Sequence, residues 1–192
     1  MIIGVLGMQG NLEEHEAALR KALSKLGLKG STIRVKSKED LDKTDALVIS
    51  GGESTTMWKL LKKTGLFEEL RKYKKPIFGT CAGLILLAKG GSDEDSKKTG
   101  QEFLGKIDAV VNRNAFGRQV DSFSVDISFD DKLFHAVFIR APAIETVGKG
   151  VKVLAECKNK IVAARQGNTL VTAFHPELTD DTRVHEYFLK LI

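Results

Sequence analysis

The first half of the chain alternates between short apolar runs and longer segments whose apolar residues recur at helical spacing. Between the first two apolar runs, the segment from Leu12 to Leu26 has apolar residues at helical spacing, namely Leu12, Ala18, Leu19, Ala22, Leu23 and Leu26. The predicted strands are 2–6, 32–35, 46–49 and 77–78, and the predicted helices are 12–26, 54–61 and 82–88. Ser54 is the expected cap of the second of these helices. This rhythm is typical of a parallel sheet with helices on both faces.

The second half contains closely spaced strand candidates instead. They cover 120–127, 134–140, 151–156, 161–165 and 169–174, and Gly167-Asn168 predicts a hairpin between the last two. The polar, glycine-bearing stretch 90–100 is interpreted as a surface loop, and 181–192 as a closing helix. We therefore expect one domain over 1–192 with an α/β fold, in which a three-layer, mostly parallel sheet flanked by helices gains antiparallel strands in its C-terminal half.

Composition narrows the class of protein. A chain of 192 residues with 42% hydrophobic and 29% charged residues suits a globular domain with its own core. Cys81 and Cys157 permit one disulfide, but so few cysteines favour a reducing compartment. The N-terminus does not resemble a signal peptide and no apolar run is long enough to span a bilayer, so we expect a cytoplasmic protein without membrane contact.

The formal charge of +5 raises the question of nucleic-acid binding. However, the lysines are scattered along amphipathic segments such as 59–63, and aromatic residues make up only 7% of the chain. No basic run with interleaved aromatic residues is present, so we predict no nucleic-acid partner.

The segment Gly79-Thr80-Cys81-Ala82-Gly83 has the form G-x-C-x-G between an apolar strand and an apolar helix. This context indicates a nucleophile elbow, a tight turn that presents a reactive side chain at the start of a helix. The positive end of the helix favours a thiolate, and the amide of Ala82 points to where an oxyanion would form. A buried cysteine in a glycine-flanked turn is the structural alternative.

Two other motifs also follow predicted strands. His175-Pro176-Glu177 offers a base and, two residues later, a carboxylate to orient it, although a solvent-facing turn would have the same sequence. Gly51-Gly52-Glu53 offers backbone amides to an anion, or is simply a tight turn. The carboxyl ends of parallel strands face one crevice, so we expect the three motifs to lie together.

The whole chain resembles the glutaminase subunits of pyridoxal 5′-phosphate synthase, which are class I (triad) glutamine amidotransferases with a flavodoxin-like fold. The resemblance is carried by six blocks in order, at 4–10, 51–57, 79–85, 112–123, 138–142 and 174–179. It implies an enzyme that hydrolyses L-glutamine to L-glutamate and ammonia through a glutamyl thioester. The ammonia would pass to a separate synthase (lyase) subunit that makes pyridoxal 5′-phosphate.

The resemblance also implies roles for single residues. Cys81 is the expected nucleophile, His175 the base and Glu177 its orienting partner, while the amides of Gly52 and Ala82 form the oxyanion hole. The glutamine pocket would consist of Gly51, Gly52, Glu53, Arg113, Ile139 and Arg140. Guanidinium groups bind carboxylates well, although structural ion pairs are the alternative for both arginines.

Several residues are expected to stay outside the chemistry. Ser50 and Asn11 depart from the family pattern, and we expect neither to touch the catalytic groups. His15, His135 and His185 lack metal-ligand spacing, so we predict no metal and no cofactor. Cys157, Met57 and Trp58 are interpreted as packing residues.

Two further classes of function compete with this interpretation. An intracellular cysteine peptidase with a similar elbow tends to carry histidine directly after the nucleophile, where this chain has Ala82. A binding subunit that has lost its chemistry would not be expected to keep Cys81, His175 and Glu177 together.

Overall fold

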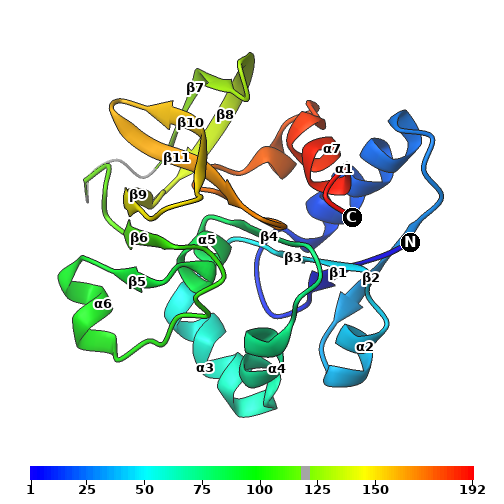
Figure 1. The fold of residues 1–192 in the computed structure, drawn as a ribbon, viewed down its shortest axis with the longest axis horizontal. Coiled ribbons are helices and arrows are strands. Elements are labelled where there is room, and N and C mark those ends of the chain that lie inside the picture. Colours follow the sequence, from blue (N-terminus) through cyan, green and yellow to red (C-terminus); the bar gives the residue numbers. More distant parts are fainter. Residues whose placement is uncertain (118–121) are drawn as a thin grey trace.

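The computed structural model of the protein describes residues 1–117 and 122–192 and has a parallel sheet at its centre. Neighbouring parallel strands follow the order β2-β1-β3-β4-β12 (Figure 1). Their bounds are Ser31–Val35, Ile2–Leu6, Ala46–Ile49, Ile77–Thr80 and Thr169–Thr172. The three central strands β3, β4 and β12 are buried along their whole length, as expected for strands covered on both faces.

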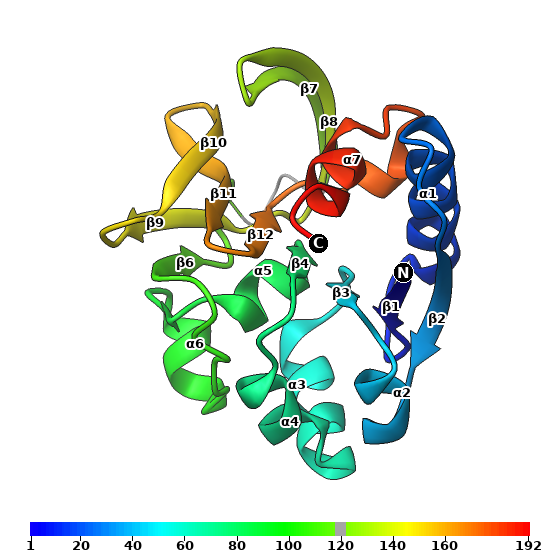
Figure 2. The same cartoon turned by 45° about the vertical axis from the view of Figure 1, so that its right-hand side comes forward.

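Helices cover the two faces of this sheet. One side carries α1 and α7, which pack against each other, and the opposite side carries α3, α4 and α5 (Figure 2). The helices span Leu12–Lys25 (α1), Ser54–Thr64 (α3), Leu66–Lys72 (α4), Ala82–Leu87 (α5) and Arg183–Leu189 (α7), and a short α2 spans Lys38–Asp42. The expected three-layer α/β architecture is therefore confirmed.

The C-terminal half widens the sheet with antiparallel strands. From β12 the order continues β11-β9-β6-β5, with β10 paired to β11. Their bounds are Lys160–Gln166, Ala143–Val147, Ala109–Asn112, Gly90–Gly91 and, for β10, Lys152–Cys157. The hairpin predicted at Gly167-Asn168 joins β11 to β12. The strands β7 (Ser122–Phe129) and β8 (Lys132–Ile139) form a separate antiparallel sheet.

Some expected elements were wrong in type or extent. The stretch 90–100 is not a loop throughout, because it contains β5 and the helix α6 (Glu94–Thr99), in which Lys98 pairs with Glu94 one turn away at 3.0 Å. The closing helix is shorter than 181–192. Residues 120 and 121 of the predicted strand 120–127, and residues 118–121 of the block 112–123, lie outside the described residues.

The cap of α3 is a second correction. Glu53, not Ser54, caps the helix: its carboxylate accepts hydrogen bonds from the amides of Thr55 at 2.9 Å and Thr56 at 2.7 Å. The Ser54 hydroxyl donates instead to Gln101 at 3.1 Å. The buried side-chain amide of Gln101 thus binds the Ser54 hydroxyl in place of the helix. Gln101 lies outside this helix, so the sequence pattern around the helix does not indicate the contact.

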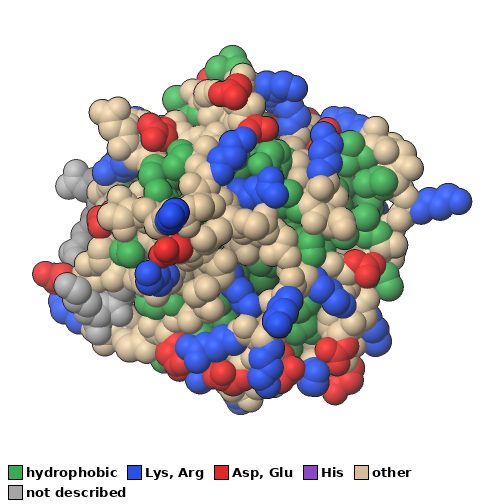
Figure 3. All heavy atoms as spheres, viewed as in Figure 1, with side chains coloured by type: hydrophobic (Ala, Val, Ile, Leu, Met, Phe, Trp, Pro, Cys, Tyr) green, Lys and Arg blue, Asp and Glu red, His purple; other side chains and the backbone are tan. Residues whose placement is uncertain are grey.

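The surface mixes charges of both signs. On the face shown in Figure 3, lysine and arginine lie next to aspartate and glutamate along the lower edge. Lys62, for example, contacts both Glu68 at 3.1 Å and Glu102 at 2.8 Å. Both Cys81 and Cys157 are free thiols. Among the described residues, no helix is both long and apolar enough to cross a bilayer.

Candidate active site

The turn between β4 and α5 holds Cys81 in a strained conformation. Its φ of 50° and ψ of −104° lie in a region that residues with a Cβ rarely adopt. The flanking glycines make this turn possible: a Cβ on Gly79 would lie 2.6 Å from the backbone of Gly83, and one on Gly83 would lie 2.2 Å from the carbonyl oxygen of Ile49. These glycines thus permit the close backbone approach that the turn requires.

The neighbouring strand brings a histidine and a carboxylate to the same place. The amide of Cys81 donates to the carbonyl of Thr172 in β12 at 2.8 Å, and His175 follows that strand. A short 3₁₀ turn, Pro176–Leu178, returns Glu177 to the ring, with Nδ1 of His175 2.7 Å from Oε1 of Glu177. His175 and Glu177 are only 5% and 6% exposed, so the solvent-facing turn is excluded.

The charge states of this pair follow from its surroundings. Burial by itself would lower the pKa of His175, but its hydrogen bonds with Cys81 and Glu177 raise that pKa to about 10. Burial would raise the pKa of Glu177, yet His15, His175 and Asn11 outweigh it and lower the pKa to about 2. At neutral pH the resting site therefore holds an imidazolium next to a carboxylate.

A cleft of about 460 Å³ opens over these groups. Gly51 lies at its base, where a Cβ would sit 2.5 Å from the His175 ring and 3.5 Å from Cβ of Cys81, so the position leaves no room for a side chain. The residues that line the cleft are Gly10, Asn11, Gly51, Gly52, Glu53, Ser54, Cys81, Ile85, Arg113, Asn114, Ile139, Arg140 and His175. All six expected pocket residues are thus in one cleft with Cys81, whereas Ala82 and Glu177 are buried behind the lining.

Arg113 is held at the cleft by neutral groups. Its guanidinium donates to Oγ1 of Thr55 at 3.2 Å and to Oε1 of Gln101 at 2.8 Å. Neither oxygen balances its charge, and among the described residues Nε is buried without a hydrogen-bond partner. These contacts leave the arginine suited to an anionic ligand.

The other pocket residues contribute mainly through their backbone. The carboxylate of Glu53 is occupied by the cap of α3 and by the Thr56 hydroxyl at 2.6 Å. The carbonyl oxygen of Ile139, at the end of β8, lies 3.9 Å from Sγ of Cys81. Arg140 is exposed and has a φ of 42°, which turns the chain sharply where β8 meets the cleft.

Sequence reasoning missed polar residues that contact the pair. Nδ2 of Asn11 donates to Oε1 of Glu177 at 3.0 Å, so the expectation that Asn11 stays away from the catalytic groups was wrong. His15 and His185 are fully buried beside Glu177. A signal existed for His15, because its spacing to Ala18 and Leu19 places it on the buried stripe of α1.

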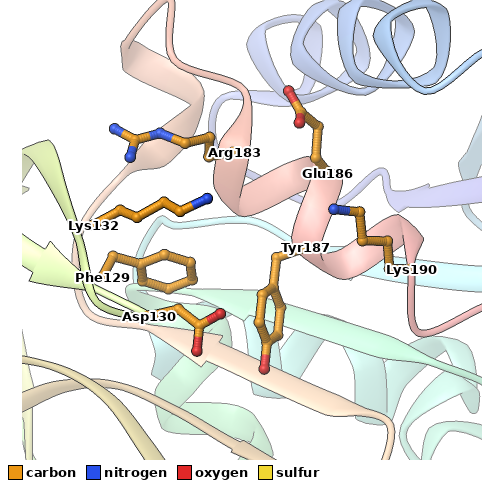
Figure 4. A pocket seen from close by; sticks show the side chains of 7 residues that line it. All are labelled: Phe129, Asp130, Lys132, Arg183, Glu186, Tyr187 and Lys190. Carbon is orange, nitrogen blue, oxygen red and sulfur yellow. The ribbon is translucent and has the colours of Figure 1, made fainter.

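A second cavity, of about 140 Å³, lies between the β7–β8 turn and α7 (Figure 4). Phe129 and Tyr187 face each other across it. The residues around it are Phe129, Asp130, Lys132, Arg183, Glu186, Tyr187 and Lys190. This set includes neither a thiol nor an imidazole, so the cleft at Cys81 is the candidate active site.

Comparison with known proteins places this site in a family. Residues 5–192 match the SNO glutamine amidotransferase family, and the chain belongs to that family. Relatives named pyridoxal 5′-phosphate synthase subunit PdxT are 53% identical in Archaeoglobus fulgidus, covering 100% of this chain and 98% of the relative, and 52% identical in Pyrococcus furiosus, covering 99% and 98%.

Solved structures agree with this assignment. One described as a crystal structure of glutamine amidotransferase superimposes with a TM-score of 0.86 at 44% identity, covering 100% of this chain and 98% of that one. The glutaminase domain of Trypanosoma brucei CTPS shares the fold at a TM-score of 0.61 with 11% identity. The mostly parallel sheet with antiparallel additions is thus the fold of class I glutamine amidotransferases.

Proposed function

We propose that the protein hydrolyses the side-chain amide of L-glutamine as the glutaminase subunit of a pyridoxal 5′-phosphate synthase. The observation that carries this proposal is the convergence of Cys81, His175 and Glu177 at one cleft, with the cysteine on a strained elbow. The PdxT relatives supply the biological setting, since they match over nearly their whole length.

The reaction follows from the charge states of the site. Sγ of Cys81, as thiolate, attacks the amide carbon of glutamine, and the His175 imidazolium gives its proton to the amide nitrogen. The carbon–nitrogen bond breaks, ammonia leaves and a glutamyl thioester remains. Neutral His175 then takes a proton from water, whose oxygen attacks the thioester; glutamate departs and the thiolate returns. Glu177 fixes the ring and stabilises the imidazolium in both halves.

The cleft offers matching contacts for the substrate. The amides of Gly52 and Ala82 stabilise the oxyanion of each tetrahedral intermediate. Arg113, whose guanidinium donates to two neutral oxygens, binds the α-carboxylate of glutamine, while Arg140 and the backbone at Gly51, Glu53 and Ile139 complete the pocket.

The released ammonia needs an acceptor on another polypeptide. The PdxT relatives, which match over nearly their whole length, are named as a subunit of pyridoxal 5′-phosphate synthase, so we place the synthase activity that receives the ammonia on a separate subunit. Two free cysteines suit the reducing cytoplasm, where we place this reaction.

The direct test is ammonia release from glutamine, measured with the synthase subunit present. We expect Cys81→Ala to abolish turnover while leaving folding and partner binding intact, because no other group of the elbow can form the thioester. Cys157→Ala is the matched control: it removes a buried thiol at the end of β10 and should retain turnover. More than a trace of ammonia from Cys81→Ala would refute the mechanism.

A further inference from the structure

Beneath the catalytic pair, two buried histidines continue the line of polar contacts into the core. Nδ1 of His15 lies 3.1 Å from Nε2 of His185, and its Nε2 lies 3.3 Å from the hydroxyl of Thr80 and 3.5 Å from Oε2 of Glu177. Both rings are fully buried between α1, α7 and β4, with Phe78 edge-on to each of them. The proposed reaction uses neither histidine.

Glu177 receives contacts on both of its carboxylate oxygens from the start of α1. Oε1 accepts from Asn11 at 3.0 Å and from His175 at 2.7 Å. Among the described residues, Oε2 is buried and accepts no well-formed hydrogen bond, and Nε2 of His15 lies 3.5 Å from it. A buried carboxylate oxygen without a donor is costly, so the nitrogen that faces it should carry a hydrogen.

The surroundings of Nδ1 of His185 indicate which ring nitrogen of each of the two histidines carries the hydrogen. Within the described part of the chain, Nδ1 of His185 is buried with no hydrogen-bond partner. If His15 carries its hydrogen on Nε2, then Nε2–H of His185 donates to Nδ1 of His15, and the orphan Nδ1 of His185 is a bare lone pair.

The opposite arrangement, in which Nδ1 of His15 carries the hydrogen, is less favourable for both His185 and Glu177. With its hydrogen on Nδ1, His15 would donate to His185 and leave a buried N–H of His185 unpaired. The lone pair of its own Nε2 would then accept from the Thr80 hydroxyl at 3.3 Å, but it would also face the Glu177 carboxylate at 3.5 Å. An unpaired buried N–H is rarer in proteins than an under-used acceptor, so the first arrangement is favoured.

We propose that His15 is a positioning residue of the glutaminase reaction, a neutral imidazole whose Nε2–H faces Oε2 of Glu177 and holds the carboxylate against His175. The inference rests on the proposed function, because it assigns His15 a role in that reaction. The relay then runs from His185 through His15 and Glu177 to His175, with each N–H directed toward the carboxylate. Asn11, the residue before α1, and His15 in the first turn of α1 each hold one of its two oxygens.

The neutrality of both deep histidines agrees with their surroundings. Burial lowers the pKa of His15, against the opposing effect of Glu177, and burial is also the largest cause that lowers the pKa of His185 to about 3. The titratable groups that face His15 are Glu177, His175, His185 and Glu14 of its own helix; those that face His175 are Cys81, Glu177 and His15.

The test compares two substitutions that differ in one donor. Gln places an amide N–H near the position of the histidine Nε2, whereas Leu fills similar space without a donor. We expect His15→Leu to lower kcat by roughly tenfold to a hundredfold at nearly unchanged KM, the range that small misplacement of a catalytic group produces. His15→Gln should recover most of this loss.

The pH dependence of kcat distinguishes a positioning role of His15 from a simple loss of folded protein in the variant. A loosened Glu177 stabilises the His175 imidazolium less, so the alkaline limb of kcat in His15→Leu should move to lower pH, while misfolding alone would leave the limb in place. His135→Gln is the control, because His135 is an exposed histidine of β8 that pairs with Asp126 of β7. This variant should match the wild type in kcat and in the position of the alkaline limb.

Nitrogen NMR of the histidine rings in the unmodified protein provides a readout independent of activity. His15 and His185 should both be neutral Nε2–H tautomers; a charged His15, or an Nδ1–H tautomer, would overturn the inference even if the variants fail to fold. The inference would also be overturned if the wild type is active and His15→Leu has the same kcat. A wild type without glutaminase activity would instead refute the proposed function.

Discussion

At the scale of single residues, the site is organised around two charges that burial alone would oppose. Glu177 stays ionised because Asn11 and His175 donate to it, and His175 stays protonated because Glu177 and Cys81 hold its charge. Arg113 differs, because its guanidinium donates to the neutral oxygens of Thr55 and Gln101. A cation placed in this way is available to a substrate carboxylate, whereas the charges of the catalytic pair are already balanced.

This difference makes Arg113 a test of substrate binding. Arg113→Ala should raise the KM for glutamine about tenfold to a hundredfold, the value of one or two charge-assisted hydrogen bonds, with a smaller change in kcat. The α-carboxylate is remote from the scissile amide, so its contact contributes equally to ground state and transition state. Steady-state kinetics of Arg113→Ala beside Arg20→Ala, an exposed arginine of α1, measures this. A large loss of kcat at constant KM would assign Arg113 to the arrangement of the catalytic groups instead.

At the scale of elements, the elbow depends on how closely α5 approaches the sheet. Gly83 in the first turn of α5 lies against the carbonyl of Ile49 in β3, and Gly79 in β4 lies against Gly83. The short helix is buried along its whole length, so it cannot shift outward to make room. Close backbone packing therefore fixes both the strand–helix angle and the position of Cys81.

We expect Gly83→Ala to lower the free energy of unfolding by about 3 kcal/mol or more, at the upper end for overpacked cores. The added methyl group would lie 2.2 Å from a backbone oxygen that the sheet holds in place. Gly90→Ala is the control, since a Cβ there meets open space, and it should change stability by less than about 0.5 kcal/mol. Denaturant unfolding of the two variants decides the point; equal stability would show that α5 can move away from β3.

At the scale of the whole molecule, strands distant in sequence deliver their ends to one cleft. Gly10 after β1, the glycine pair after β3, Cys81 after β4 and His175 after β12 all line it. Oε1 of Gln9 accepts from the amide of Glu53 at 3.1 Å and lies against Gly52, whose φ is 133°. A surface contact at the first strand can thus reach the peptide proposed to complete the oxyanion hole.

We predict that the free subunit is a poor glutaminase and that the synthase subunit activates it. A glycine peptide rests with its N–H turned away at little cost, and a partner that favours the productive orientation by ~3 kcal/mol would raise the active fraction about a hundredfold. Glutamine turnover should be measured for the purified chain and then during titration with the synthase. Full activity in the isolated chain, unchanged at saturating partner, would contradict the prediction without touching the roles of Cys81 and His175.

The sequence by itself determined the elements whose signals are local. The apolar runs of β1, β3 and β4, the helical stripe of α1 and the glycine-flanked cysteine each follow from neighbouring residues, and their strand ends pointed to one crevice. The short helices α2 and α4 and the strands β6 and β9 were not anticipated, because so few residues carry little periodicity and partners distant in the chain stabilise them.

Only the tertiary structure decided which polar residues serve the site. Asn11 and His15 reach Glu177 across 166 and 162 residues of chain, and Glu53 caps α3 while the hydroxyl of Ser54 donates to Gln101. Hydrogen bonds between distant segments depend on the packing of α1, α7 and the sheet, which leaves no periodic mark on the sequence. Local patterns therefore predicted Cys81 as the nucleophile, whereas packing decided which polar groups contact His175 and Glu177.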